Sequence, residues 1–209
     1  MAGFNKEALA FANAHLEEQK QAIMDTLPYI NHVFTSDAST GDPLAWDLLS
    51  DYILGIDGWA TDFYGNTHTV SFKCRRPSED YTVDLRLEAI KLTDDASRQN
   101  DCAGFMFRGE RYAFDGFCSI NCQTIDGKHY VFLGTEVMAL QLYFGSDDNT
   151  LIKEIKEKYS KGKEGNEFFS GRYYVFIDAE RFRSFIRWLA EHRAFYQCGQ
   201  DADEETSDA

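Results

Sequence analysis

The segment 56–76 constrains the fold more than any other part of the chain. Two stretches rich in β-branched and aromatic residues, IDGWATDF and THTVSFKCRR, flank the dipeptide Gly65-Asn66. Glycine and asparagine are favoured in tight turns between antiparallel strands, so the pattern predicts a β-hairpin. If the turn centres on this dipeptide, the numbers of facing residues sum to about 130 or 131, which places Asp57 opposite residue 73 or 74.

The predicted hairpin brings three polar side chains together on facing strands. Asp57 and Lys73 become near neighbours on facing strands, and Ser71 shares the face of Lys73 because side chains alternate along a strand. We therefore predict a site made of Asp57, Ser71 and Lys73. The alternative is an ordinary surface ion pair between Asp57 and Lys73, which contributes about 0.2–1 kcal/mol to stability.

Helices are expected before and after the strands. Apolar residues recur at helical spacings within 4–27 and predict an amphipathic helix that ends near Pro28. Asp42-Pro43 opens a second helix over 44–53, and a third is predicted over 179–192. The apolar stripe of this last helix consists of Phe182, Phe185, Ile186 and Leu189, and the arginines off the stripe are Arg181, Arg183 and Arg187.

The remaining segments complete an α/β (α+β) fold. Further strands are predicted over 81–92, 103–114, 117–125, 129–135 and 172–178, with a turn at Asp126-Gly127. The interleaved lysines and glutamates of 146–167 predict a short solvated helix followed by a flexible loop. We expect a central mixed β-sheet flanked by helices, a single domain over 1–199, and a disordered acidic tail over 200–209.

Charge and composition limit the partners and the compartment. The net charge is −14, with 21 Lys+Arg against 35 Asp+Glu, which excludes a wholly basic nucleic-acid-binding face. Residues 1–70 contribute −8 and the tail −5, so residues 71–199 are nearly balanced and leave room for a local basic groove. No apolar stretch is long enough to span a bilayer, and the five cysteines are odd in number and widely spread. We expect a soluble cytoplasmic protein with no membrane partner.

The motif order resembles that of the PD-(D/E)XK nuclease superfamily, which has the restriction-endonuclease-like fold. The resemblance is good over residues 45–90 and loose over 172–190. The segment LLSDYILGIDGWATDFYGNTHTVSFKCRR is similar to the family's core of a helix, an aspartate, a hairpin and a (D/E/Q)-x-K motif, with YTVDLRLEAI following as the next strand of the sheet. The segment RYYVFIDAERFRSFIRWL is similar to the family's closing strand and helix.

The resemblance implies a metal-dependent nuclease acting on DNA phosphodiester bonds, with Mg²⁺ or Mn²⁺ as cofactor. It implies that Asp57 is a metal ligand, that Phe72 lends its backbone carbonyl, and that Lys73 stabilises the nucleophile or the developing charge. Hard oxygen ligands suit Mg²⁺, and positive charge suits the phosphate transition state. In this chain the family's second acid is replaced by Ser71, which is neutral and a poor ligand for Mg²⁺.

Other residues are candidates to compensate for Ser71 or to bind phosphate. Asp51 and Glu88 are the candidates for a relocated carboxylate, and Asp84 ranks below them. Arg75 and Arg76 follow Lys73 directly and are candidates for phosphate contacts at the mouth of the site.

Two further hypotheses belong to other functional classes. A catalytically degenerate nuclease fold could serve as a protein-binding module in a phage or defence system, and Ser71 favours this reading. An acidic inhibitor that imitates DNA would suit the net charge of −14. The expected partners are DNA or a nucleic-acid-processing protein, and a homodimer is left open.

A zinc site is disfavoured because the spacing of its candidate ligands matches no common zinc module. Those candidates are Cys102, Cys118, Cys122 and His129.

Overall fold

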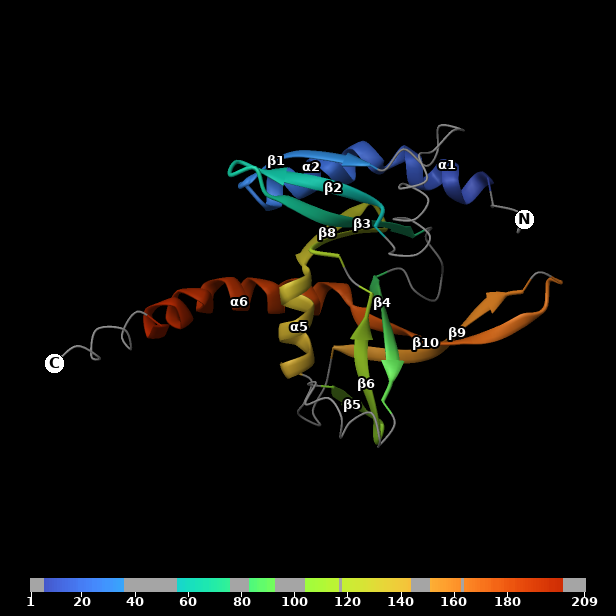
Figure 1. Ribbon diagram of the computed structural model, residues 1–209. Coiled ribbons are helices and arrows are strands. Elements are labelled where there is room, and N and C mark those ends of the chain that lie inside the picture. The colour runs from blue at the N-terminus through green and yellow to red at the C-terminus, as the bar shows by residue number, and fades with distance from the viewer. Residues whose placement is uncertain are drawn as a thin grey trace.

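The computed structural model describes residues 6–35, 56–75, 83–92, 104–116, 118–143, 151–162 and 164–200. Over these residues the chain forms four helices and ten strands, and the strands make two five-stranded sheets. The protein is therefore an α+β structure in which strands predominate (Figure 1). No helix within the described ranges is both long and apolar enough to cross a bilayer.

The first sheet, sheet A, carries the predicted hairpin. Its strands lie in the order β1-β2-β3-β7-β8, and all neighbours are antiparallel except β3 and β7, which are parallel. The strand bounds are β1 Ile30–Thr35, β2 Gly58–Asp62, β3 Thr67–Arg75, β7 Ile120–Ile125 and β8 Lys128–Leu133. Every residue of β7 is buried, because this strand has a neighbour on each edge and packed groups on both faces.

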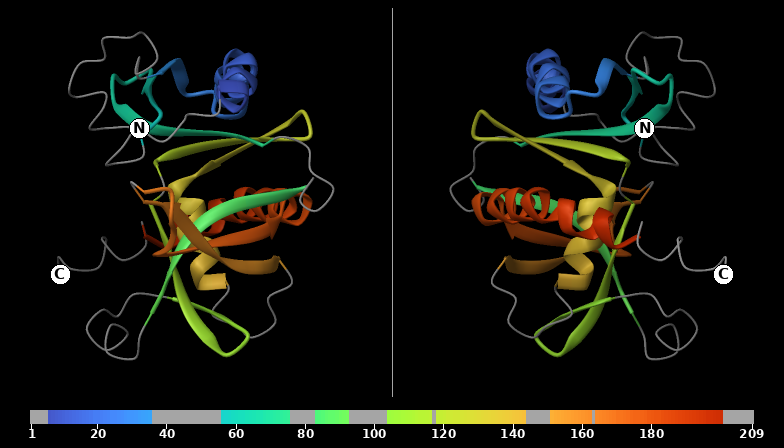
Figure 2. Two further views of the ribbon diagram at one scale, coloured as in Figure 1. Left: turned by 90° about the vertical axis from the view of Figure 1, so that its right-hand side faces the viewer. Right: turned by 90° about the vertical axis from the view of Figure 1, so that its left-hand side faces the viewer.

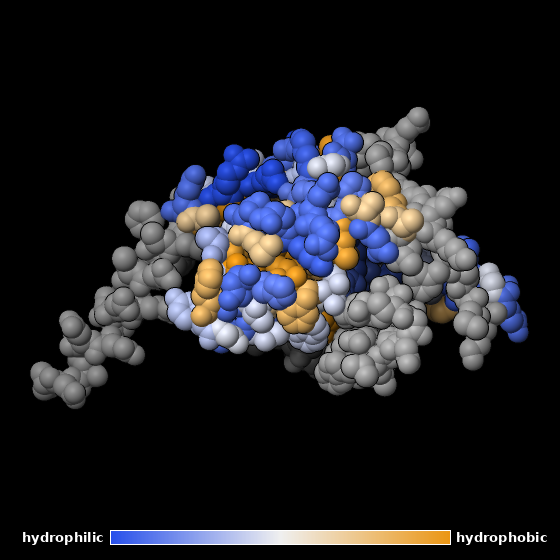
Figure 3. Space-filling model, turned by 90° about the horizontal axis from the view of Figure 1, so that it is seen from above, coloured by the Kyte–Doolittle hydropathy of each residue, from blue (hydrophilic) through white to orange (hydrophobic). Residues whose placement is uncertain are grey.

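Two N-terminal helices, α1 (Lys6–Ala14) and α2 (Leu16–Thr26), cover the outer face of sheet A (Figure 2). Ile23 of α2 packs with Val70 and Cys122 of the sheet in a compact apolar cluster. The opposite side of α2 carries charged and amide side chains, and the face of the molecule seen in Figure 3 is mostly hydrophilic. The predicted helix over 4–27 is thus two helices, which meet at His15.

The second sheet, sheet B, is antiparallel throughout, with the strand order β5-β6-β4-β10-β9. The strand bounds are β4 Asp84–Lys91, β5 Phe105–Phe107, β6 Glu110–Asp115, β9 Ile152–Lys161 and β10 Glu167–Asp178. Helices α5 (Gly134–Tyr143) and α6 (Ala179–Gln200) contribute to the larger core, which also receives Phe132 from sheet A and Leu85 from sheet B. This core joins the two sheets into one body.

Several predictions from local sequence pattern are confirmed. The hairpin forms as β2 and β3, and the turn at Asp126-Gly127 has both residues at positive φ, as a two-residue hairpin turn of this kind requires. The strand over 81–92 appears as β4. Helix α6 buries the predicted stripe and leaves the three arginines exposed.

The predicted register of the hairpin was wrong. Gly58 faces Val70 and Thr61 faces Thr67, so facing residues sum to 128 rather than to 130 or 131. The loop consists of the three residues 63–65, and Gly65 takes the positive φ of 82° that such a loop needs at its last position. The carboxylate of Asp62 closes the loop by accepting hydrogen bonds from the backbone N–H groups of Tyr64 and Asn66.

The predicted helix within 146–167 was also wrong, because this stretch contains strand β9. Pairing with β10 overrides the helical preference of the lysines and glutamates. In the strand, Ile152 is buried in the core and Ile155 packs against it. The strands also form two sheets instead of one central sheet: β4 and β10 lie in sheet B, and β7 is the strand next to the hairpin. Helix α5 was not predicted. The helix over 44–53 and the tail over 201–209 lie outside the described residues.

Candidate functional site

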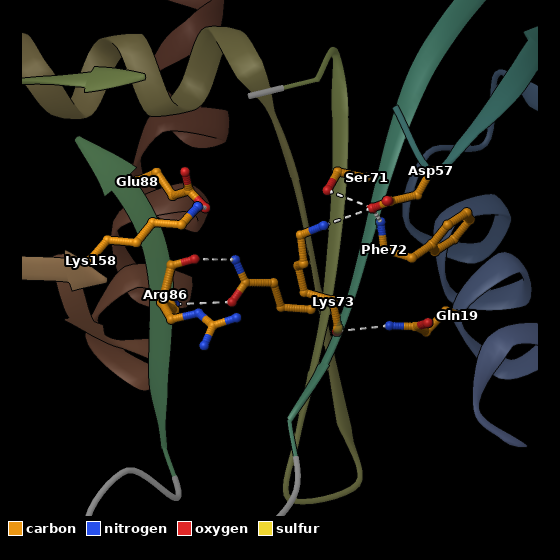
Figure 4. Close-up of polar contacts among 9 residues, drawn as sticks. Gln19, Asp57, Ser71, Phe72, Lys73, Arg86, Glu88 and Lys158 are labelled. Atoms are coloured by element: carbon orange, nitrogen blue, oxygen red, sulfur yellow. Dashed lines mark hydrogen bonds and ion pairs between the residues drawn. The ribbon is translucent and has the colours of Figure 1, made fainter. Parts of the chain in front are cut away.

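The carboxylate of Asp57 is held by three consecutive residues of β3. Its Oδ2 atom accepts hydrogen bonds from Ser71 Oγ at 3.0 Å, from the Phe72 backbone N–H at 2.8 Å and from Lys73 Nζ at 2.9 Å (Figure 4). The expected proximity of Asp57, Ser71 and Lys73 is therefore confirmed, even though the register differs by two to three residues. The cluster forms because Asp57 stands one residue before β2, where the Asp57 N–H still bonds to the Val70 carbonyl at 2.9 Å.

Gly58 allows β1 to lie close beside Asp57. A Cβ atom at Gly58 would meet the backbone oxygen of Phe34 at 2.5 Å and the ring of Phe72 at 3.1 Å. Real Cβ atoms do not approach backbone this closely, so a larger residue would push β1 away from β2. The glycine directly after Asp57 is therefore explained by packing.

Helix α2 supports the site from the outer face of sheet A. The buried Gln19 side chain donates a hydrogen bond from Nε2 to the Lys73 backbone carbonyl at 3.0 Å (Figure 4). This contact fixes the backbone from which the lysine side chain extends. A glutamine on the buried face of α2 thus serves to position β3.

A small polar cleft adjoins the Asp57 cluster at the junction of the two sheets. Its volume is about 60 Å³. One wall comes from sheet A and the other from β4 and the end of β6, so it is a feature of the junction and of neither sheet alone. The lining residues are Ser71, Lys73, Asn121 and Gln123 on the first wall and Arg86, Leu87, Glu88, Asp115 and Gly116 on the second.

Gln123 bridges the two walls. Its Oε1 atom accepts a hydrogen bond from the Arg86 backbone N–H, and its Nε2 atom donates one to the Arg86 carbonyl, both at 3.1 Å. Strand β6 pairs with β4 only from Glu88 onward, so the Gln123 amide bonds to β4 just beyond the end of that strand pairing. The amide fixes the separation of the walls.

Glu88 stands on the wall opposite Lys73 and is surrounded by cations (Figure 4). Lys158 Nζ lies 2.6 Å from its carboxylate, and Arg172 Nη1 lies 3.6 Å from it. Arg172 also reaches Asp115, with 3.0 Å between Nε and Oδ2. Of the two candidates for a relocated carboxylate, Glu88 therefore lines the cleft, whereas Asp51 lies outside the described residues.

Arg75 is placed differently from its expected role at the mouth of the site. Its guanidinium donates to the Asp84 backbone carbonyl and lies over the Phe176 ring, 5.6 Å from the centroid. Burial lowers the pKa of Arg75, and the nearby Arg86 adds to that effect. Asp84 is buried and pairs with Lys153 at 2.6 Å. Arg75 thus ties β3 to β4, and Arg76 lies outside the described residues.

The cleft and its edge carry oxygen donors of the kind that Mg²⁺ prefers. Within the described ranges no three His, Cys, Asp or Glu side chains come together as a preformed metal cage. Asp57 offers a carboxylate and Ser71 a hydroxyl, and Glu88 offers a second carboxylate across the cleft. Mg²⁺ is commonly bound by one or two carboxylates, with water and substrate phosphate completing its six ligands.

The cysteines considered for zinc pack in the interior instead. Burial raises the pKa of Cys122 to about 12, and burial also raises the pKa of Cys118. Cys122 belongs to the apolar cluster beneath α2, and His129 Nδ1 lies 2.9 Å from Thr124 Oγ1. Cys102 lies outside the described residues.

Sequence reasoning missed three residues of the cleft region. Lys158 was assigned to a solvated helix, and Arg172 and Gln123 were not singled out. Ile152 and Ile155 are three residues apart, which is a helical spacing, so the local pattern gave no signal for strand β9. No local sequence pattern indicates the role of Gln123, because that role depends on its hydrogen bonds to β4, which is distant in the sequence.

Comparison with known proteins returned no match: no family model, no curated protein and no solved structure matches this chain.

Proposed function

We propose that this chain is a nuclease-like protein of the restriction-endonuclease-like kind, which holds a nucleic-acid backbone at the cleft and hydrolyses its phosphodiester bonds with Mg²⁺ or Mn²⁺. The observation that supports this most directly is the contact of Asp57 with both Ser71 and Lys73, at the edge of a polar cleft. An acid directly before one strand and a lysine on the facing strand are the pair that the D…x-K motif requires.

The chain's own residues have distinct tasks in this proposal. Asp57 and Glu88 supply the carboxylates, and a bound metal ion supplies Lewis-acid stabilisation of phosphoryl oxygens. Lys73 is half-exposed, so its ammonium can turn from Asp57 toward a phosphate oxygen or the attacking water. Ser71 donates a hydrogen bond to Asp57 and helps to hold its carboxylate beside Lys73.

Metal-dependent cleavage assays test the proposal. Linear, supercoiled and single-stranded DNA are incubated with wild type, Asp57→Asn and Lys73→Met, in Mg²⁺, Mn²⁺ or EDTA. We expect cleavage that requires metal and falls by about 100-fold or more in each variant. Lys128→Met is the matched control, because Lys128 makes a surface ion pair with Glu180 at the same 2.9 Å distance. Cleavage that persists in Asp57→Asn would exclude this site.

A second candidate is a related protein that binds nucleic acid or a processing protein without cutting. Two observations favour it: the neutral Ser71 replaces a carboxylate, and Asp57 Oδ2 already accepts three hydrogen bonds. Divalent-metal titration separates the two candidates. Metal binding that strengthens when a nucleic acid is added supports the nuclease, whereas nucleic-acid binding that is indifferent to metal, without cleavage, supports the second candidate.

A further inference from the structure

The hairpin of β9 and β10, here called the arm (residues 151–172), differs in charge from the rest of the chain. It carries six Lys or Arg residues and four Glu residues, whereas the other residues hold 15 Lys or Arg against 31 Asp or Glu. The arm reaches out from the body of the molecule (Figure 1). A net positive projection on a chain of net charge −14 indicates a polyanionic partner for this element.

The outer part of the arm exposes three aromatic side chains. Tyr159 is 55% exposed, Phe168 53% and Phe169 40%. The rings of Tyr159 and Phe169 lie 6.2 Å apart, and the Phe169 ring lies 5.2 Å from Tyr173, which itself contacts Tyr112 of the core at 5.4 Å. This series of ring contacts runs from the core outward. It holds the rings of Tyr159 and Phe169 in defined positions, although about half of their surface meets water.

The cations of the arm begin at the cleft. Lys158 is bonded to Glu88, which lines the cleft, and Lys156 lies on the same face of β9 two residues earlier. Arg172 pairs with both Glu88 and Asp115. Phe168 faces Ser160, which is two residues beyond Lys158, so one side of the arm presents lysines and then an exposed ring.

We propose that the arm binds an unpaired stretch of nucleic acid and leads it into the cleft. Lysine and arginine side chains contact the phosphates, and bases stack on Phe168 and on the pair of Tyr159 and Phe169. Stacking needs access to the faces of bases, which a duplex hides within its own stack, so the arm selects single strands or unpaired ends. This inference rests on the proposed function, since it assigns the substrate class of the same cleft.

The test measures binding separately from cleavage. Fluorescence anisotropy of a labelled oligothymidine of about 20 nucleotides, and of a duplex of the same length, is recorded in EDTA. We compare wild type with Phe168→Ala and with Tyr159→Ala/Phe169→Ala. The matched control is Phe63→Ala/Tyr64→Ala, which removes two rings that are 70% and 87% exposed on the loop between β2 and β3. Thermal unfolding verifies that each variant is folded.

We expect the single strand to bind at least tenfold more tightly than the duplex. Each arm variant should lose about tenfold or more in affinity for the single strand, and the control should stay within about twofold of wild type. A third variant, Lys156→Gln/Lys158→Gln, should make the slope of log K against log [salt] shallower by about one to two. Equal losses in the arm variants and the control, or tighter binding of the duplex, would overturn the inference.

The outcomes distinguish this inference from the proposed function. Binding that depends on the arm, without metal-dependent cleavage, supports the inference and contradicts the nuclease. Cleavage with unchanged binding by the arm variants contradicts the inference alone. If wild type binds no nucleic acid, both are wrong. Exposed rings can also form a dimer interface, and sedimentation velocity tests this alternative. If wild type is a dimer and Tyr159→Ala/Phe169→Ala is a monomer, the arm serves self-association and the inference is overturned.

Discussion

Gln123 and Arg86 exchange two hydrogen bonds across the junction of the sheets, in the manner of paired residues in an antiparallel ladder. The partner of the Arg86 backbone is a side-chain amide because β6 pairs with β4 only from Glu88 onward, whereas β10 pairs with the other edge of β4, where Phe176 faces Arg86. Gln123 is buried, and it lines the cleft that also contains Ser71 and Lys73. The Gln123 side chain therefore helps to set the separation of the cleft walls.

Replacing Gln123 with leucine should destabilise the protein by about 1–3 kcal/mol, because the backbone N–H and carbonyl of Arg86 lose their partner where water has poor access. Urea unfolding at neutral pH measures the loss. The matched control is Gln21→Leu, which removes an exposed amide bonded only at the surface, and we expect it to change stability by less than about 0.5 kcal/mol. Equal effects of the two substitutions would show that the bridge does not stabilise the junction.

Replacing Ser71 with glutamate should convert the site into a stronger metal site. The new carboxylate lies beside Asp57 at a buried position, so without metal the two negative charges repel and the melting temperature falls. Added Mg²⁺ or Mn²⁺ at about 100 times its Kd would restore about 2.7 kcal/mol. At roughly 2–4 °C per kcal/mol for a chain of this size, thermal unfolding detects the gain. Ser71→Gln is the neutral control, and a glutamate variant that responds to metal no more than this control would contradict the site.

Acid should loosen the loop between β2 and β3 through Asp62. The side-chain amide of Asn66, together with backbone N–H groups and His68, lowers the pKa of Asp62 to about 2. Because the folded-state pKa lies below the ordinary value of 3.8, the stabilisation is fully present above about pH 4 and is lost as the pH falls toward 2. Stability measured across this window should fall less steeply in Asp62→Asn than in wild type. Parallel curves for the two proteins would exclude Asp62 as the source.

Cys122 should resist alkylation in the folded protein. Burial raises the pKa of its thiol to about 12, so almost no thiolate forms at pH 8. Iodoacetamide treatment followed by peptide mass spectrometry should find Cys122 unmodified until urea unfolds the chain. Cys74 is less buried and should react sooner, although burial raises the pKa of its thiol as well. Rapid modification of Cys122 in the folded state would contradict its packing beneath α2.

The site was predictable to the extent that its contacts are local in sequence. Asp57, Ser71 and Lys73 are joined by one short loop, and strand alternation alone places the last two on one face. The register was not predictable from the Gly65-Asn66 dipeptide, because the loop consists of residues 63–65 and is closed by the side chain of Asp62, so that Asn66 lies beyond it. The contacts survived this error because a long lysine side chain spans a shift of two residues.

The parts that depend on distant strands could not be predicted in the same way. Lysines and glutamates favour a helix, and β9 becomes a strand only because β10 offers it a partner. The same holds for β7, which lies beside β3 although three strands of the other sheet separate them in the sequence. Gln123 acquires its role only after β4 and β7 have been brought together.

The chain passes from sheet A to sheet B and back between β3 and β7, and then returns to sheet B for β9 and β10. During synthesis from the N-terminus, all strands of sheet A exist once Leu133 has been added. At that stage β10 has not yet been made, so the edge of β4 that pairs with β10 is open. Leu85 and Leu87 of β4 also lack the core residues that β10 contributes. An unfinished chain therefore presents an open strand edge to other molecules, and its protection from aggregation begins only when the last third of the chain leaves the ribosome.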